Sequence, residues 1–390
     1  MINDTPLESP RARVLNWLKR SLESGEIAAG SQMPAAHAIG KRLGVATNTA
    51  AAALEEAEKL GLAVRREGSR KRYAGEARKG VGDSLSSATV YVLARPGRFT
   101  DIATAPSWSD GFLALDIVRH VSNAGRHVSL VNAGTLSPGD FDALFAARPA
   151  GLAVKDSVYG DPLAMRALER CHEAGIPAVA YGNAPELRAF DRVYSDHRAG
   201  ARDITRWLLA HGRSRIVPFF PFAPADFWAR ERVAGYEEAM REAGLKPAQC
   251  VVFGSASVGA EQTAENFRLD AALALSALVS LRRGGTGPDA LLCLNDDWAK
   301  PALAAIRDLG LAPNRDILVA GYDNMARGAG FDAFCPLCPA VTVDKHNERS
   351  AEDIAGLLLA RMAGTLPPEP QARIHKHELV EIKPLGTLET

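Results

Sequence analysis

The chain has 390 residues, with 46 Lys and Arg balanced by 46 Asp and Glu, and 47% of its residues are hydrophobic. This length and composition favour two or three globular domains with a substantial core. We see no signal peptide and no uncharged apolar run long enough to span a membrane, so we expect a cytoplasmic protein without a membrane partner. The five scattered cysteines exclude a disulfide framework.

The charges are unevenly distributed along the chain. Residues 1–80 hold 14 Lys and Arg against 9 Asp and Glu, which leaves 32 against 37 in the remainder. A small basic head on a larger acidic body indicates a different partner for each part.

The basic part begins with three predicted helices. Ser9-Pro10 is a good start for the first one, and a second short helix is predicted over AAHAIGKRL (35–43). The third follows in LGVATNTAAAALEEAEKLGL (43–62), where the small apolar residues from Ala50 to Leu60 recur on one face. Thr47 and Asn48 point outward from this third helix.

A basic hairpin is predicted directly after the helices. LAVRR (62–66) and RKRYA (70–74) flank Glu67-Gly68-Ser69, and seven basic residues lie between Arg65 and Lys79. Helix, helix-turn-helix and basic hairpin is the order of a winged helix, in which one helix enters the major groove and the wing contacts phosphates. The alternative is an alanine-rich packing helix beside a solvated basic face.

The stretch from IAAGSQMP to LGLAVRREG resembles the GntR-type winged helix, with its G-x-x-[LM]-P entry, L-G-V turn and L-x-x-x-G-L exit. The resemblance covers residues 8–75 and implies operator DNA as a partner. Ala46 and Thr47 depart from the Ser-Arg pair of the family, and Ala36 and His37 depart from its acidic-Arg pair. The predicted DNA-binding residues combine short groove-reading side chains with a basic wing: His37, Thr47, Asn48, Thr49, Gly68, Arg70, Lys71 and Arg72.

After a predicted linker over residues 76–87, apolar runs alternate with amphipathic helices through residues 88–385. The predicted strands are 88–94, 127–133, 151–155, 177–182, 215–220, 250–254, 290–295 and 317–322. Such alternation predicts an α/β fold with parallel sheets covered on both faces, and eight strands suit two lobes. We therefore expect a two-lobed, doubly wound parallel-sheet sensor domain preceded by a small winged helix-turn-helix domain.

Five landmarks follow in order through the second half: VYSDHRAG, RERVAGY, LLCLND, GYDN and PAVTVD. They resemble the sensor domain of LacI-type repressors, which is similar to periplasmic sugar-binding proteins; residues 88–195 match only in their strand-helix pattern. A GntR-type head on a LacI-type sensor resembles the arabinose-repressor class of bacterial regulators.

Ligands of two-lobed α/β domains lie beyond the carboxyl ends of the strands, and sugar hydroxyls pair well with carboxylates and guanidinium groups. The resemblance assigns Arg232 and Asp296 to the ligand site. Strand ends and aromatic rings add four further candidates: Asp323, Asp156, Trp298 and Trp108.

Structural alternatives remain open for three of these candidates. Arg232 has a possible surface salt bridge to Glu231 or Glu237. Asp296 is placed to cap the helix that begins DDWAK, and Asp323 is placed to cap a turn.

The sequence gives little support for a metal or redox site, a phosphate-binding loop or a catalytic site. Cys335 and Cys338 form a lone C-x-x-C without further ligands, GGTG (284–287) lacks the lysine and the strand-to-helix context of a phosphate loop, and no enzyme motif is present. We therefore expect no catalytic residue, metal or cofactor.

The sequence predicts a ligand-responsive transcription regulator, a repressor that acts as a homodimer and senses a small molecule, most simply a sugar. Two other classes remain as alternatives. One is a cytoplasmic solute-binding module without gene-regulatory output, and the other is an enzyme on a doubly wound sheet.

Overall fold

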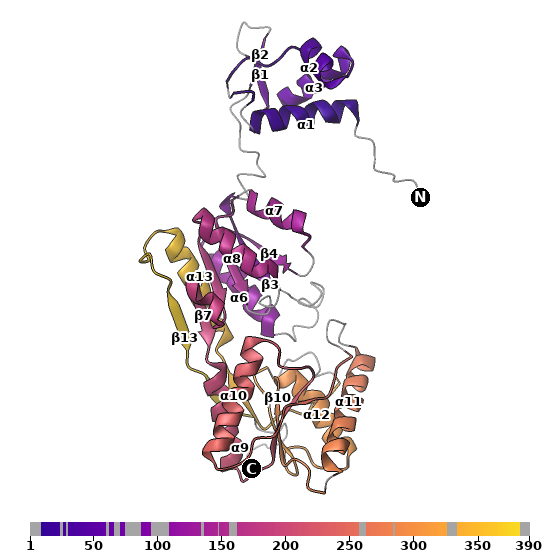
Figure 1. Ribbon diagram of the computed structural model, residues 1–390, viewed down its shortest axis with the longest axis vertical. Coiled ribbons are helices and arrows are strands. Elements are labelled where there is room, and N and C mark those ends of the chain that lie inside the picture. The colour runs from indigo at the N-terminus through magenta and orange to yellow at the C-terminus, as the bar shows by residue number, and fades with distance from the viewer. Residues whose placement is uncertain are drawn as a thin grey trace. The chain divides into compact units, whose positions relative to one another are not determined.

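The computed structural model describes residues 9–23, 26–28, 30–59, 62–65, 71–74, 87–94, 109–133, 136–146, 148–155, 162–256, 263–283, 285–325 and 334–382. The chain forms two compact units, Met1–Ser86 and Ser87–Thr390, which we call the head and the sensor (Figure 1). Each unit has its own hydrophobic core. None of the described helices is both long and apolar enough to cross a membrane.

The head contains the three predicted helices, α1 (Pro10–Glu23), α2 (Ala36–Leu43) and α3 (Thr47–Lys59). The hydroxyl of Ser9 accepts a hydrogen bond from the backbone N–H of Ala12, so the predicted cap of α1 is confirmed. The apolar face of α3 packs with Val14 and Leu18 of α1 in the core of the head. Strands β1 (Ala63–Arg65) and β2 (Arg72–Ala74) pair antiparallel as the predicted hairpin, whose turn lies outside the described residues.

The first lobe of the sensor is built on a six-stranded sheet in the order β13-β7-β6-β5-β3-β4, with every neighbouring pair parallel. Its strands are β3 (Thr89–Ala94), β4 (His127–Asn132), β5 (Gly151–Lys155), β6 (Ala178–Tyr181), β7 (Asp191–Ser195) and β13 (Ala372–His375). Its helices are α6 (Ser109–Asn123), α7 (Pro138–Ala146), α8 (Pro162–Ala174), the 3-10 helix η3 (Pro185–Ala189) and α13 (Asn347–Met362). Two separate cores, one on each face, hold helices against this sheet.

The second lobe has a sheet of the same size in the order β14-β12-β11-β10-β8-β9, parallel except for the edge pair β12–β14. Its strands are β8 (Ile216–Phe220), β9 (Val251–Val252), β10 (Ala290–Cys293), β11 (Leu318–Ala320), β12 (Val341–Asp344) and β14 (Glu378–Glu381). Its helices are α9 (His197–Ala210), α10 (Phe227–Glu242), α11 (Ala264–Arg282) and α12 (Asp296–Asp308). The chain passes between the lobes after β7, after β12 and after β13.

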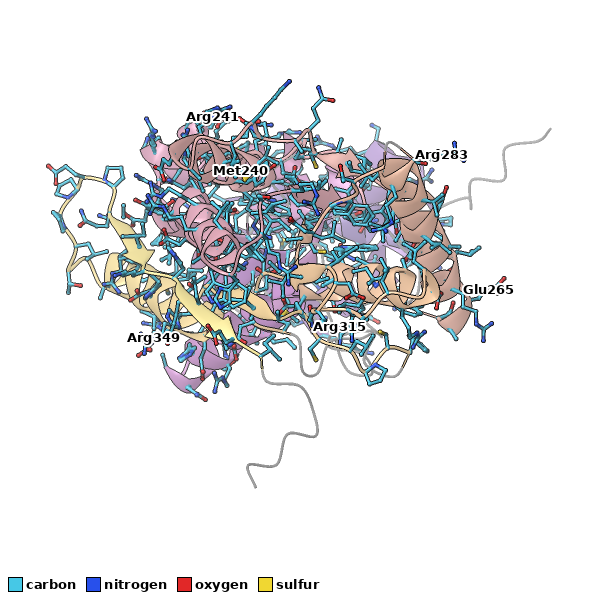
Figure 2. The ribbon with its side chains drawn as sticks, turned by 90° about the horizontal axis from the view of Figure 1, so that it is seen from below. Met240, Arg241, Glu265, Arg283, Arg315 and Arg349 are labelled. Atoms are coloured by element: carbon cyan, nitrogen blue, oxygen red, sulfur yellow. The ribbon has the colours of Figure 1, made fainter. Side chains whose placement is uncertain are left out.

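All eight predicted strands are present, and the predicted α/β fold with two parallel-sheet lobes is confirmed. The helices show the expected division between core and surface. On α10, Met240 is buried in the core, whereas its neighbour Arg241 lies at the surface (Figure 2). Helix α11 has Glu265 in its first turn and Arg283 directly after its last residue, which suits the dipole of a helix (Figure 2).

Two sequence landmarks owe their glycines to close packing around α9. A Cβ atom on Gly235, the glycine of RVAGY, would lie 2.1 Å from the carbonyl oxygen of Arg198, so α10 touches α9 here. A Cβ atom on Gly200, the glycine of DHRAG, would lie 2.2 Å from the hydroxyl of Tyr322. A side chain at either position would push α9 away from its neighbour.

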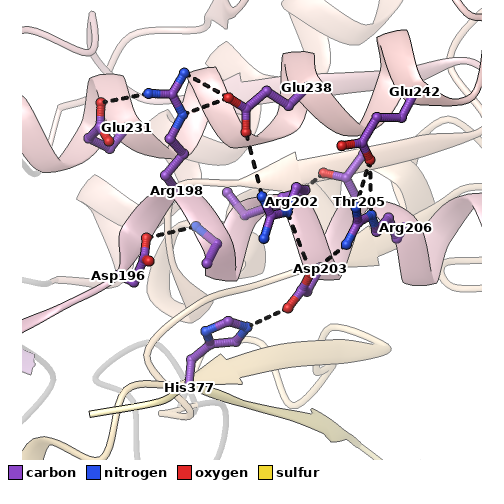
Figure 3. A network of polar contacts seen from close by, with 12 residues as sticks. Asp196, Arg198, Arg202, Asp203, Thr205, Arg206, Glu231, Glu238, Glu242 and His377 are labelled. Carbon is purple, nitrogen blue, oxygen red and sulfur yellow. Dashed lines mark hydrogen bonds and ion pairs between the residues drawn. The ribbon is translucent and has the colours of Figure 1, made fainter. Parts of the chain in front are cut away.

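An exposed ionic network joins the same two helices (Figure 3). Arg198 and Arg206 of α9 bind Glu238 and Glu242 of α10, with nitrogen–oxygen distances of 2.7 and 2.8 Å. Asp203 of α9 also accepts a contact from His377, 3.0 Å away, in the last crossing between the lobes. Exposed pairs such as those between α9 and α10 contribute little to stability because solvent screens them, so apolar packing and the glycine contact dominate the joint.

Candidate ligand-binding and DNA-binding sites

Arg232 is the centre of a buried polar cluster at the carboxyl ends of the second sheet. It comes from α10 and is only 3% exposed. Its Nη2 lies 3.2 Å from Oδ1 of Asp323, and its Nη1 donates to the carbonyl oxygen of Leu294. The carbon of the guanidinium lies 3.5 Å from the ring centroid of Tyr322 and 4.8 Å from the ring centroid of Trp228, so both rings make cation–π contacts with it.

Asp323, which follows β11, also binds Lys345, which follows β12. Nζ of Lys345 lies 2.9 Å from the same Oδ1 that Arg232 contacts. Burial by itself would raise the pKa of Asp323, but the charges of Lys345 and Arg232 outweigh it and hold this pKa well below its usual range. Burial would likewise lower the pKa of Lys345, yet the charge of Asp323 raises it, so both groups are ionised.

His197 and Lys155 extend the cluster toward the first lobe. Nδ1 of His197 accepts a hydrogen bond of 3.4 Å from Nε of Arg232, and burial and the charge of Arg232 lower the pKa of this histidine, which keeps the ring neutral. Lys155 is the last residue of β5 and is 5% exposed. Its Nζ lies 5.7 Å from the ring centroid of Tyr181, whose hydroxyl is hydrogen-bonded to Ser195 at 2.9 Å.

Asp296 is fully buried beside this cluster. Its Oδ2 accepts a hydrogen bond of 2.6 Å from the backbone N–H of Met325, and burial raises its pKa to about 7. The alternative that Asp296 caps α12 is wrong, because Asn295 is the capping residue and its side chain accepts from the N–H of Trp298 at 3.0 Å.

The structure therefore brings Arg232 and Asp323 into direct contact, with Asp296 near Asp323. The alternative surface salt bridge of Arg232 is wrong, since Glu231 and Glu237 instead contact Arg198 and Arg241. Trp298 lies in the core of the second lobe, with its ring edge-to-face with Phe222 and Phe253. Asp156 and Trp108 lie outside the described residues.

Three members of the cluster were not predicted from the sequence: Lys155, His197 and Lys345. Lys155 and Lys345 end or follow a strand, as the predicted aspartates do. The same positional argument identifies them once cations as well as carboxylates are considered.

The described part of the sensor contains at least two cavities. One of about 20 Å³ between the lobes is lined by residues that include Asn183, Leu187, His197 and Trp228, and it has room for little more than one water molecule. Another of about 270 Å³ lies at the amino ends of β6 and β7, where Arg361 uses its donors on Asp191 and on two backbone carbonyls. Because that arginine is already satisfied by the protein, we assign no ligand to the larger cavity.

Several of the predicted DNA-binding residues lie at the surface of the head. His37, Thr47 and Asn48 are exposed, Thr49 is half-buried and Lys71 is exposed, while Gly68 and Arg70 lie outside the described residues. Arg72 has a different environment from the one expected for a phosphate contact. Its side chain is 18% exposed and binds Glu58 of α3, which also binds Arg65 at 2.9 Å.

Glu58 therefore fastens both strands of the wing to α3. Burial would raise the pKa of this carboxyl, but hydrogen bonds from Arg65 and Arg72 outweigh it and lower the pKa. Two of the basic residues of the wing, Arg65 and Arg72, are thus paired with a carboxylate of the head itself.

All five cysteines are free, and no group of side chains that would hold a metal occurs among the described residues. Cys335 is buried, and Sγ of Cys338 lies 3.8 Å from Nζ of the fully buried Lys300.

Comparison with known proteins identifies a separate counterpart for each unit. Residues 10–71 match the family of bacterial regulatory proteins of the gntR type, and residues 205–381 match the periplasmic binding protein-like domain. The HTH-type transcriptional repressor PurR of Vibrio atlanticus is 25% identical over 216 residues, which is 55% of this chain and 59% of the repressor. PurR of Vibrio campbellii is 28% identical over 190 residues, so this chain spans between half and three-fifths of these curated relatives.

Solved structures agree on the fold. A regulatory protein of the LacI family from Chloroflexus aggregans matches with a TM-score of 0.54 and 21% identity, over 76% of this chain and 98% of that one. The transcriptional regulator CelR, solved as a cellobiose complex, matches with a TM-score of 0.57 and 20% identity, over 89% of this chain and 98% of that one.

Proposed function

Because this chain joins a GntR-type DNA-binding head to a LacI-type, periplasmic-binding-protein-like sensor, we propose that it is a ligand-responsive transcription regulator that acts as a repressor. The observation that carries the proposal is the presence, on one chain, of an exposed helix-turn-helix and of a buried polar cluster at the carboxyl ends of a two-lobed sheet pair. The names of the curated relatives, which are transcriptional repressors, support it.

In the proposed complex, α3 lies in the major groove of operator DNA. Asn48 reads an adenine through its N6 and N7 atoms, and Thr47 and Thr49 contact thymine methyl groups or phosphates. His37 and the wing residues Gly68, Arg70 and Lys71 add contacts to the backbone. Arg72 contributes mainly through Glu58, by setting the angle of the wing on α3.

The ligand lies between the lobes, where the strands of both sheets end. Arg232 and Asp323 bind its polar groups, with Asp296, Asp156, Trp298 and Trp108 as further candidates for contact. We propose a sugar or sugar derivative, a class supported by the cellobiose complex of CelR. Ligand binding favours the closed arrangement of the lobes, and a change in the DNA-competent population follows from that difference in affinity.

A two-fold operator requires two heads, so the proposed assembly is a homodimer, which acts in the cytoplasm where operator DNA lies. The fold of a dimeric Lac repressor, which matches 75% of this chain with a TM-score of 0.57, supports this assembly. The domain limits proposed are 8–75 for the head, 76–87 for the linker and 88–385 for the sensor.

Selection of bound duplexes from a random DNA pool tests the DNA-binding half of this proposal. The full chain is expected to enrich an inverted repeat, because two identical heads read two half-sites. Recovery of unselected sequences at every salt concentration would leave the head without a sequence-reading role.

A further inference from the structure

Helix α11 of the second lobe packs into the core with one face and leaves the opposite face in solvent. The buried face consists of Phe267, Ala271, Ala274 and Leu278. On the other side, Leu269, Leu273 and Val279 are 49%, 38% and 37% exposed. Among the described residues only seven large apolar side chains are exposed, and these are three of them. Apolar residues that gather on one helix face in this way indicate a surface that contacts another molecule.

The apolar face of α11 lies at the edge of the second sheet. The edge strand is β9, where Val252 is 48% exposed. A Cβ atom on Gly254, two residues further along, would lie 3.6 Å from a methyl carbon of Leu273, so the end of this strand adjoins the exposed side of α11. A second apolar element therefore flanks the helix at the same edge of the lobe.

The exposed face of α11 is also complementary to its own reverse. Exposed residues recur along it at alternating intervals of four and three, as on the contact face of a coiled coil: Glu265, Leu269, Ala272, Ser276, Val279 and Arg283. The stripe begins with a negative charge and ends with a positive one, and Figure 2 shows these two residues at opposite ends of the helix. Its three successive pairs of residues, taken from the ends inward, all have the same midpoint, at Ala274.

This symmetry identifies the partner as a second copy of the chain. Two α11 helices that lie antiparallel across a two-fold axis at Ala274 bring each Glu265 opposite Arg283 of the partner subunit. The same axis brings Leu269 opposite Val279 of the partner subunit. A partner of another kind would require neither the opposite charges at the two ends nor their common midpoint with the apolar pair.

We propose that the two chains of the homodimer meet through α11, which packs antiparallel against α11 of the second copy about a two-fold axis. This inference rests on the proposed function for the homodimer itself and deepens it by naming the surface that joins the chains. Ala272 and Ser276 lie at the centre of the stripe, where small side chains let two helices approach closely. The stripe is about 27 Å long at 1.5 Å per residue, and the charges at its ends fix the register of the two helices.

Sedimentation of the full chain in the absence of DNA measures the dissociation constant of the dimer. Leu269→Glu places a charge in the apolar stripe of both copies and is expected to raise this constant at least about a hundredfold. Ile374→Glu introduces the same charge at a site of the first lobe that is 52% exposed, and it is expected to leave the dimer unchanged. Because both positions are exposed, both variants should keep the melting temperature of the isolated fold, which circular dichroism measures.

Reversing the charges at the two ends tests the antiparallel register. Glu265→Arg alone, or Arg283→Glu alone, places like charges opposite each other at both ends of the stripe. Each variant is expected to dissociate at least about tenfold more readily at low ionic strength. An equal mixture of the two variants should recover the affinity of the native dimer, because the mixed dimer has opposite charges at both ends.

Four results would overturn the proposal. They are a native chain that is monomeric at micromolar concentrations, a dimer that persists in Leu269→Glu, single charge reversals without effect, and a mixture that does not recover. The charge reversals decide even if Leu269→Glu does not fold. The selection of operator DNA is a separate measurement. A dimer joined by α11 that enriches no DNA sequence would contradict the proposed function alone, whereas an enriched inverted repeat with a persistent Leu269→Glu dimer would contradict the interface alone.

Discussion

Arg232 has partners on every side: a carboxylate, a backbone carbonyl, an imidazole nitrogen and two aromatic rings. Such an arginine is fixed before any ligand arrives, which lowers the entropic cost of using it for binding. The same contacts make it part of the architecture of the second lobe. A substitution at Arg232 therefore affects stability as well as ligand affinity.

We predict that Arg232→Met lowers the free energy of unfolding by about 2–4 kcal/mol, because Leu294 and His197 lose a buried donor and Asp323 loses one of its two cations. Urea denaturation of the full chain measures this change. Arg241→Met, which removes an exposed pair with Glu237, is the matched control and is expected to change stability by less than about 1 kcal/mol. Equal effects of the two substitutions would mean that the cluster around Arg232 is open to solvent.

The raised pKa of Asp296 leads us to predict a specific dependence of stability on pH. Its folded pKa of about 7 lies above the ~3.9 of an unfolded aspartate, so the folded state holds the proton more tightly. This contribution to stability is complete at low pH and is lost as the pH rises toward 7. Between about pH 5 and pH 8, the native chain should lose roughly 1–3 kcal/mol of stability relative to Asp296→Asn. Urea denaturation of both chains at the two pH values tests this, and a constant difference would exclude a raised pKa.

At the scale of elements, the joint between α9 and α10 shows which kind of contact holds the second lobe together. The ionic network of Figure 3 is exposed, whereas Gly235 sits where the two backbones touch. A methyl group at that point overlaps a backbone carbonyl, which no side-chain rotation relieves. Shape therefore outweighs charge in this joint.

Gly235→Ala is accordingly predicted to destabilise the chain by about 1–3 kcal/mol or more. Glu238→Ala, which removes the contacts with Arg198 and Arg202, is predicted to cost less than about 1 kcal/mol. Thermal unfolding of the two variants ranks the effects. A larger loss in Glu238→Ala would reverse our assignment of what fixes the joint.

For helix α3, we predict that Asn48→Ala removes discrimination of roughly 1–3 kcal/mol at one base pair in each half-site. Fluorescence anisotropy with operator duplexes that differ at single positions provides the measurement. Asn123→Ala, the same substitution at an exposed site in the first lobe, is the control. Discrimination by Asn48→Ala equal to that of the native chain would mean that α3 is not the groove-reading helix.

The sequence predicts most of the elements because the central strands are continuous apolar runs bounded by turns. It does not predict β7, β13 and β14, where charged residues interrupt the pattern, nor the four-residue strand β12, whose residues were used only as the PAVTVD landmark. Asp191 begins β7 and is nevertheless buried, because Arg361, 170 residues away in the chain, binds both of its carboxylate oxygens. The residues around Asp191 in the sequence give no indication of this distant partner.

The candidate site, like the fold, is predicted only in part from the sequence. Arg232 and Asp323 are found from a motif and from a strand end. Lys155 and Lys345 are not predicted, because the candidates at strand ends were chosen as carboxylates that bind sugar hydroxyls. The two lysines also follow or end strands of different sheets, so the composition of the cluster is known only from the folded sensor.

At the scale of the whole molecule, the three chain crossings are the elements that any closing motion of the sensor must accommodate. Lys345 lies in the second crossing and binds Asp323, so the cluster that we assign to the ligand is attached to a crossing. At the third crossing, His375, the last residue of β13, lies 2.8 Å from Asp353 of the first lobe, and His377 in the crossing lies 3.0 Å from Asp203 of the second. A ligand bound at the proposed site would therefore act on the segments that join the lobes.

We propose above all that one chain couples the binding of a small molecule to the binding of DNA. The most direct test is the dissociation constant of the full chain for its selected operator, measured with and without a saturating amount of the compound that most raises its melting temperature. We predict a change of roughly 5- to 150-fold, the range of ordinary allosteric coupling, with weaker DNA binding in the presence of the compound. A dissociation constant that is unchanged while the compound is bound would contradict this coupling.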